Sequence, residues 1–144
     1  MREIALSRSD IRIVYPVHLN PNVREPVNRI ISNTDNIYLI DTLIYSDFIK
    51  LIDSSYLIVT DSSGIQEEAS SLGKPVLVTI SSTERPEAFE AGTVELVGVD
   101  KHKIINSIER LLNDKNYYEV MSKVHNPYGD GEAVELILSA IIKG

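Results

Sequence analysis

Short apolar runs alternate along the chain with segments in which apolar residues recur every three or four positions. Such runs are typical of strands buried in a parallel sheet, and the three-and-four spacing is typical of helices that bury one face. The runs predict strands over residues 11–18, 37–40, 56–60, 76–80 and 93–97. The spacing predicts helices over residues 1–9, 23–31, 47–52, 65–72, 101–112, 115–124 and 132–142. This alternation predicts a doubly wound α/β fold, a mostly parallel sheet with helices on both faces.

Polar residues, glycine and proline set the expected ends of these helices. Asn22, Ser46 and Asp100 each stand where a side chain can accept a hydrogen bond from a free amide at a helix start. Pro26 is compatible with a helix if it lies in the first turn, where its missing amide hydrogen costs nothing. Gly73 is expected to end a helix in a left-handed turn, because glycine adopts a positive φ without a steric penalty.

The third expected strand leads into a turn of small and polar residues, Asp61 to Gly64, and then directly into a helix. A helix that follows a parallel strand starts at the carboxyl edge of the sheet, and its first amides have no partner within the helix. Such a turn suits an anion, above all a phosphate. The alternative is that the serines only cap the helix.

The loop 82–87 follows the next expected strand and therefore reaches the same edge of the sheet. Arg85 in this loop can form a forked pair with a phosphate or carboxylate, or it can pair in solution with Glu84 or Glu87. Free amides and an arginine at one edge predict a di-anionic ligand. The segments 18–21 and 41–48 are expected at that edge too.

Composition narrows the possible classes of protein. The 144 residues, 43% apolar and 24% charged, fit one folded domain. A net charge of −7 argues against a nucleic-acid partner, and no apolar run approaches the ~20 residues of a membrane span. The chain has no cysteine and only three scattered histidines, which argues against disulfides, thiol catalysis and a metal site. These features fit a cytoplasmic protein.

Several motifs together resemble the non-hydrolysing UDP-N-acetylglucosamine 2-epimerases. They are YPVHLNP at 15–21, TDSSGIQEEA at 60–69, LGKPVLV at 72–78, TERPEA at 83–88 and NPYGDG at 126–131. The resemblance covers nearly the whole chain in order. It implies a Rossmann-like domain that is one half of a GT-B-type, two-domain enzyme, with residues 1–144 as a single UDP-binding domain. Residues 130–143 would form a closing helix that returns toward the N-terminal domain.

The resemblance also implies an activity. Members interconvert UDP-N-acetylglucosamine and UDP-N-acetylmannosamine by eliminating UDP and adding it back, without a cofactor or a metal. They are cytoplasmic isomerases of cell-envelope polysaccharide biosynthesis, and a homodimer is expected. Two alternatives stay open: a GT-B glycosyltransferase domain that uses the same UDP site, and a nucleotide-sugar-binding module without catalysis.

Positions that match the family motifs carry expected roles. Ser62, Ser63 and Gly64 would hold the diphosphate through hydroxyls and amides. Glu68 would accept hydrogen bonds from the ribose hydroxyls, and Arg85 would contact the ligand from its loop.

The resemblance implies roles for two further residues, and the chain also differs from the family at some positions. The backbone around Phe48 would line the uracil pocket, and His18 would lie near a regulatory molecule of the substrate. Taken singly, Phe48, His18 and Glu68 also fit ordinary structural roles. Ser63 stands where the family usually has glycine. The family's His-Arg-Arg-Glu-Asn block, first strand and N-terminal acid/base carboxylates are not matched. We therefore expect a fragment with no catalytic residue of its own, inactive alone and with an exposed sheet edge.

Overall fold

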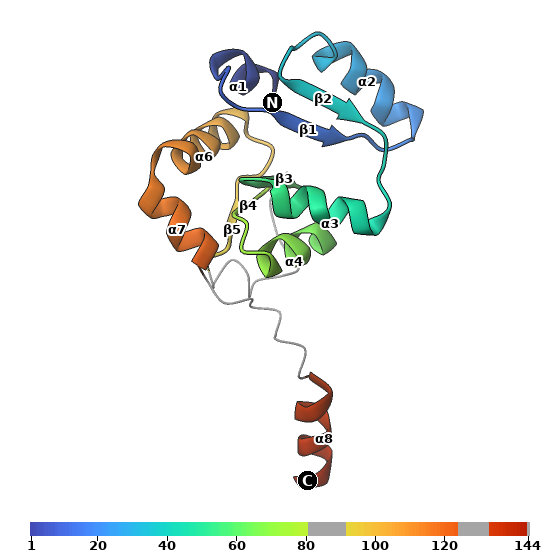
Figure 1. The fold of residues 1–144 in the computed structure, drawn as a ribbon, viewed down its shortest axis with the longest axis vertical. Helices are drawn as coiled ribbons and strands as arrows, with labels where there is room; N and C mark the ends of the chain where they lie inside the picture. Colours follow the sequence, from blue (N-terminus) through green and yellow to red (C-terminus); the bar gives the residue numbers. More distant parts are fainter. Residues whose placement is uncertain (81–91, 124–132, 144) are drawn as a thin grey trace. The chain divides into compact units, whose positions relative to one another are not determined.

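The computed structural model describes residues 1–80, 92–123 and 133–143 (Figure 1). The chain divides into two compact units, Met1–Phe48 and Ile49–Gly144. Every strand pair among the described residues is parallel, in one two-stranded and one three-stranded sheet, and each of the first three strands is followed along the chain by a helix. The predicted α/β class with parallel sheets is confirmed. No described helix is both long and apolar enough to cross a membrane.

The first unit is a β-α-β arrangement preceded by a short helix. Its elements are α1 (Arg2–Ser7), β1 (Ile13–Pro16), α2 (Pro21–Ile31) and β2 (Ile37–Ile40). Strand β1 pairs with β2 with Ile13 opposite Ile37. A parallel pair needs a crossover connection, and α2 supplies it. Its apolar core consists of Ala5, Ile31 and Ile37, packed against Ile13, Val27 and Leu39.

One side-chain amide joins the end of α1, the segment before β1 and the start of β2. The Nδ2 group of Asn36 donates hydrogen bonds to the carbonyl oxygens of Ala5 at 3.0 Å, Arg8 at 2.9 Å and Ile11 at 3.1 Å. These carbonyls belong to the end of α1 and the segment before β1, whereas Asn36 directly precedes β2. The amide therefore satisfies backbone acceptors that no regular element reaches.

The start of α2 differs from the expectation. Asn20, not Asn22, is the cap: its side chain accepts from the amide of Asn22 at 3.0 Å, and Pro21 occupies the first helical position. Because the helix starts earlier, Pro26 lies inside it and not in the first turn. Proline at the first position has a pre-set φ and needs no amide hydrogen, which favours this start. One helical hydrogen bond is lost at Pro26.

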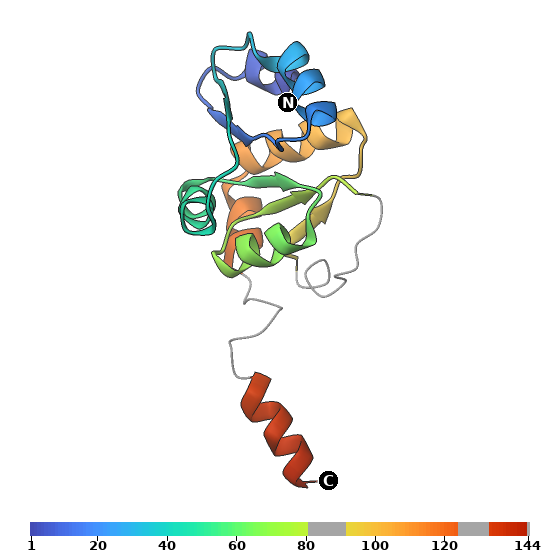
Figure 2. The same cartoon turned by 90° about the vertical axis from the view of Figure 1, so that its right-hand side faces the viewer.

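The second unit contains the three-stranded sheet. Its strands are β3 (Ile58–Thr60), β4 (Val76–Val78) and β5 (Val94–Leu96) in the order β3-β4-β5, with Ile58 opposite Val76 and Val76 opposite Val94. Its helices are α4 (Ser63–Ser71), α6 (Lys101–Asn113), α7 (Lys115–Lys123) and α8 (Ala133–Lys143). Helices α4 and α6 both contact β4 and lie on opposite sides of the strands (Figure 2). The three residues of β4 are fully buried.

Helix α3 (Tyr45–Ser54) contains the boundary between the units. It begins one residue before Ser46, so the prediction that Ser46 caps it was wrong. The carbonyl oxygen of Ile44 instead accepts from the amides of Asp47 at 3.1 Å and Phe48 at 3.0 Å.

Two local predictions in the second unit are confirmed. Gly73 ends the α4 segment with a φ of 65°, and a Cβ on it would lie 3.1 Å from the carbonyl oxygen of Ser122. The positive φ therefore favours glycine, and a side chain here would also press on the carbonyl of Ser122. Asp100 caps α6, where its carboxylate accepts from the amide of Lys103 at 2.8 Å.

Asn36→Ala is expected to lower the free energy of unfolding by about 1–3 kcal/mol, because the hydrogen bonds of the Asn36 amide group to these carbonyls are lost. The measurement is urea unfolding followed by circular dichroism. Asn106→Ala, at an exposed position of α6, is the control and is expected to change the free energy by less than about 0.5 kcal/mol. An Asn36→Ala chain as stable as the parent would contradict this role.

Candidate functional site

The connection from β3 to α4 forms the candidate site. Ser62 is the N-cap of α4 with an extended backbone, φ −89° and ψ 128°, and its carbonyl oxygen accepts the first helical hydrogen bond from Gln66 at 3.2 Å. Its side chain makes no capping hydrogen bond, and the first turn of α4 contains no acidic residue. The positive end of this helix is therefore compensated neither by a side-chain cap nor by a carboxylate within its first turn.

Three backbone donors are available at this helix start. Within the described part of the chain, the amides of Ser63, Gly64 and Ile65 have no hydrogen-bond acceptor. Ser63 and Gly64 are exposed, and Ser62 is half-buried. Adjacent amides at the positive end of a helix are suited to the oxygens of a phosphate.

The glycine at position 64 is not required by the fold. Its φ is not positive, and a Cβ on it would have only the Oγ of Ser62 nearby, at 4.0 Å. The missing side chain instead leaves open space beside the free amides. This is the arrangement needed where an external group approaches the backbone closely.

The structure places four of the expected site residues on one segment. Ser62, Ser63 and Gly64 form the start of α4, and Glu68 follows Gly64 by four residues, which puts both on one face of the helix. Glu68 is half-buried. The four residues thus lie within two turns of one helix start, and their roles in ligand binding stay predictions.

The other expected residues belong to other parts of the chain. Arg85 lies outside the described residues. Phe48 and His18 both belong to the first unit. Phe48 lies in α3 and is half-buried, whereas His18 lies two residues after β1 and is exposed. The Nδ1 atom of His18 accepts a hydrogen bond from the amide of Asn20 at 3.1 Å. Their roles stay predictions.

One residue of this turn was missed by the sequence analysis. The Oγ1 atom of Thr60 accepts a hydrogen bond from the amide of Ser62 at 3.1 Å. A threonine two residues before a helix cap is a known signal for such a side-chain turn, and it could have been read from the sequence.

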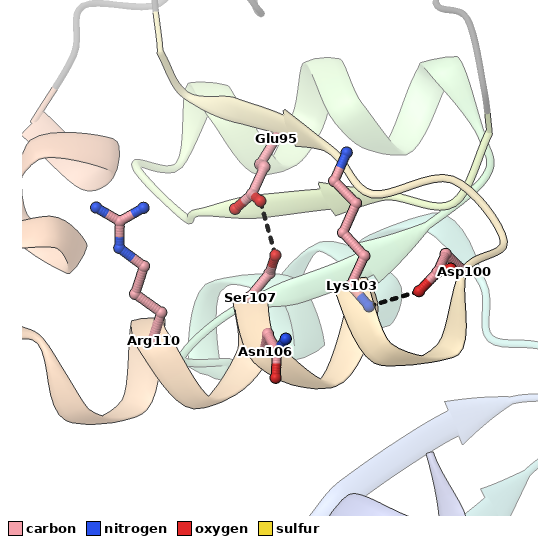
Figure 3. A pocket seen from close by; sticks show the side chains of 6 residues that line it. All are labelled: Glu95, Asp100, Lys103, Asn106, Ser107 and Arg110. Carbon is pink, nitrogen blue, oxygen red and sulfur yellow. Dashed lines mark hydrogen bonds between the residues drawn. The ribbon is translucent and has the colours of Figure 1, made fainter.

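A second group of charged side chains lies between β5 and α6 and borders an open hollow of about 530 Å³ (Figure 3). It is lined by Glu95, Asp100, Lys103, Asn106, Ser107 and Arg110.

The charges around this hollow are paired within the protein. The carboxylate of Glu95 accepts from the Oγ of Ser107 at 2.7 Å and from the hydroxyl of Tyr117 at 3.0 Å. The guanidinium of Arg110 lies 3.6 Å from the centre of the Tyr117 ring, and Lys103 donates to the carbonyl oxygen of Leu96 at 2.5 Å. This group fixes α6 and α7 on the edge strand β5. Among the described residues, no cluster of three or more metal-ligating side chains is found.

Comparison with known proteins adds the family. A family model described as UDP-N-acetylglucosamine 2-epimerase matches residues 1–142. The UDP-N-acetylglucosamine 2-epimerase of Escherichia coli (strain K12) is 59% identical over 141 residues, which are 98% of this chain and 38% of that protein. The enzyme of the same name from Campylobacter jejuni is 57% identical over 144 residues, 100% of this chain and 38% of the relative.

Solved structures agree with this similarity. The UDP-GlcNAc 2-epimerase from Neisseria meningitidis bound to UDP-GlcNAc has a TM-score of 0.89 and 46% identity, over 99% of this chain and 38% of that one. The S. aureus MnaA–UDP co-structure also has a TM-score of 0.89 and 46% identity, over 97% of this chain and 38% of that one. The chain thus spans 38% of the length of these relatives.

The phenol of Tyr117 provides a test of the Glu95 group. Burial, followed by the hydrogen bond and charge of Glu95, raises the pKa of Tyr117 above its ordinary value of 10.0. Since the folded state holds this proton more tightly than the unfolded state, the resulting stability is present below about pH 10 and is lost as the pH rises through the folded-state pKa. Glu95→Gln is expected to lower the pKa of Tyr117 part of the way, because burial remains.

The measurement is an NMR titration of the tyrosine rings. Tyr118 is an internal control, because its pKa is raised by burial and by Tyr56 without Glu95. An unchanged Tyr117, or an equal shift of both tyrosines, would contradict the assigned cause.

Proposed function

Because the chain belongs to the UDP-N-acetylglucosamine 2-epimerase family, we propose that it is the UDP-binding portion of an enzyme that interconverts UDP-N-acetylglucosamine and UDP-N-acetylmannosamine. The observation that carries this proposal is the set of three unpaired amides at the start of α4, beside a glycine that the fold itself does not need. Relatives solved with UDP-GlcNAc and with UDP support the choice of ligand.

In the proposed complex the diphosphate lies against Ser62, Ser63 and Gly64. Glu68 accepts hydrogen bonds from the ribose hydroxyls one helical turn away, and Arg85 neutralises charge from its loop. The backbone around Phe48 lines the uracil pocket, and His18 serves a regulatory molecule of the substrate. The helix start and the arginine together match the two negative charges of the ligand.

The proposed contribution to catalysis is electrostatic. In the elimination step the C1–O bond breaks with its electron pair leaving on UDP, a proton leaves C2, and a double bond forms between C1 and C2. The reverse step adds UDP back to C1 and a proton to the opposite face of C2, which inverts the configuration at C2. Amides already fixed at the helix start stabilise the charge on departing UDP without reorganisation. The groups that move the C2 proton are assigned to the part of the enzyme beyond this chain.

The partners proposed for this chain follow from its partial coverage. Residues 1–144 would act as one UDP-binding domain, opposite an N-terminal domain, in a cytoplasmic homodimer. Helix α8 fits the surface between domains, because five apolar side chains spaced along one stripe are exposed on it. They are Val134, Ile137, Leu138, Ile141 and Ile142.

Gly64→Ala is expected to weaken UDP binding about tenfold or more, because the new methyl group occupies the space beside the amides. The melting temperature should stay the same or rise slightly, since alanine favours a helix. The measurements are calorimetric titration with UDP and thermal unfolding. Ser71→Ala, at the exposed far end of α4, is the control and should bind UDP like the parent. Equal affinity of Gly64→Ala and the parent would contradict the proposed site.

Epimerase activity is expected only when the missing portion is supplied. The chain should be inactive alone and should interconvert the two UDP-sugars after mixing with the separately produced N-terminal portion of a relative. The assay follows UDP-N-acetylmannosamine formation by NMR. Activity of the chain alone would contradict the assignment of proton transfer to the other portion. An inactive mixture whose components are folded and bind UDP would favour a binding module without catalysis.

A further inference from the structure

We propose that Thr60 is a positioning residue of the phosphate site, whose hydroxyl holds the β3–α4 turn in the conformation that presents the free amides. This inference rests on the proposed function, because it names the residue that prepares the same site for UDP. Thr60 itself is 8% exposed, so it acts through the turn and not by contact with the ligand.

Two sets of hydrogen bonds fix Thr60 from both sides. On the sheet side, Thr60 lies opposite Val78. The carbonyl oxygen of Thr60 accepts hydrogen bonds from the amide of Thr79 at 2.9 Å and from the Oγ1 of Thr79 at 3.4 Å. Its Oγ1 accepts from the amide of Ser62 at 3.1 Å. The position of the Ser62 amide is thereby tied to the sheet, across the intervening exposed Asp61.

This hydrogen bond replaces the usual way of fixing a helix start. A serine cap normally accepts from an amide of the first turn through its own hydroxyl, which orders the turn but uses up a donor. Here the side chain of Ser62 makes no such bond. The hydroxyl of Thr60 orders the cap residue from the strand side, so the next three amides and the hydroxyl of Ser62 stay available for a ligand.

An ordered turn without a ligand is what preorganised binding requires. Donors that already point at the ligand position need little reorganisation when the ligand arrives. If the turn also samples other conformations, the apparent affinity for the ligand falls in proportion to the fraction of molecules in the binding-competent conformation. Loss of one such hydrogen bond is expected to weaken UDP binding on the order of tenfold.

The matched control is a second buried threonine near the same sheet. Thr93 is 1% exposed, directly precedes β5, and its Oγ1 lies 3.5 Å from the Oγ of Ser70, away from the turn. A purely structural threonine is expected to affect stability without a specific effect on the turn. Thr93→Val therefore shows what loss of a buried hydroxyl does by itself.

The experiment compares the parent chain with Thr60→Val, Thr60→Ser and Thr93→Val. Valine keeps the branched shape and removes the acceptor, and serine keeps the acceptor. UDP affinity is measured by calorimetry, and exchange of the Ser62 to Ile65 amides is measured by NMR without ligand. We expect Thr60→Val to bind UDP about tenfold more weakly and to lose protection of the Ser62 amide, while Thr60→Ser and Thr93→Val keep both within about twofold.

The outcomes separate this inference from the proposed function. Parent-like UDP affinity in Thr60→Val, or equal weakening in Thr93→Val, overturns the positioning role. If the folded parent chain does not bind UDP, the proposed function fails for this chain, and amide exchange still decides the inference. In that case, faster exchange of the Ser62 amide in Thr60→Val supports the inference that Thr60 orders the turn. Unchanged exchange of the Ser62 amide overturns the inference.

Discussion

The start of α4 is a helix terminus without a side-chain cap, and the proposed function of this chain depends on that constraint. A helix leaves its first amides without internal partners, and most helices satisfy one of them with a side chain. Here the amides of Ser63, Gly64 and Ile65 have no acceptor in the described part of the chain, and the cap residue Ser62 does not supply one. Parallel pairing of β3 with β4 then places this terminus at the carboxyl edge of the sheet, where ligands of α/β proteins bind.

The surrounding fold keeps this terminus in place. The fully buried strand β4 is contacted by α4 and α6, and Gly73 permits the sharp return from α4 into β4. The Glu95 group ties α6 and α7 to the edge strand through hydrogen bonds, which makes it a structural element of the same unit. In the proposed enzyme this rigid scaffold supplies fixed donors for UDP, and the proton-transfer chemistry comes from the portion of the relatives that this chain does not span.

The sequence predicted those features whose physics is local. Gly73 and Asp100 were assigned correctly, because a left-handed turn and a helix cap depend on a few adjacent residues. The start of α2 was misassigned because Asn20 and Asn22 are both capable caps, and the advantage of Pro21 at the first helical position decided between them. The contacts of Asn36 join residues up to 31 positions apart, so no short pattern reveals them.

The candidate site, like the fold, could be predicted from the sequence only in part. The turn at 61–64 and the helix after it could be read from the sequence, and the structure adds which donors are free and why glycine stands at position 64. The role of Thr60 was missed although its position two residues before the helix cap is a readable signal, because only the residues of the turn itself were considered. Arg85 was proposed from the place of its loop at the sheet edge and from family resemblance, and Phe48 and His18 were proposed from resemblance alone; the roles of all three stay predictions.

The most direct test of the central claim is an amide NMR titration of the intact chain with UDP. The account predicts that the largest chemical-shift changes, growing to saturation, fall on the amides of Ser63, Gly64 and Ile65, with Glu68 following. Saturable changes centred elsewhere, such as on the residues around Glu95, or no changes in a folded chain, would contradict the assignment of the α4 terminus as the phosphate site.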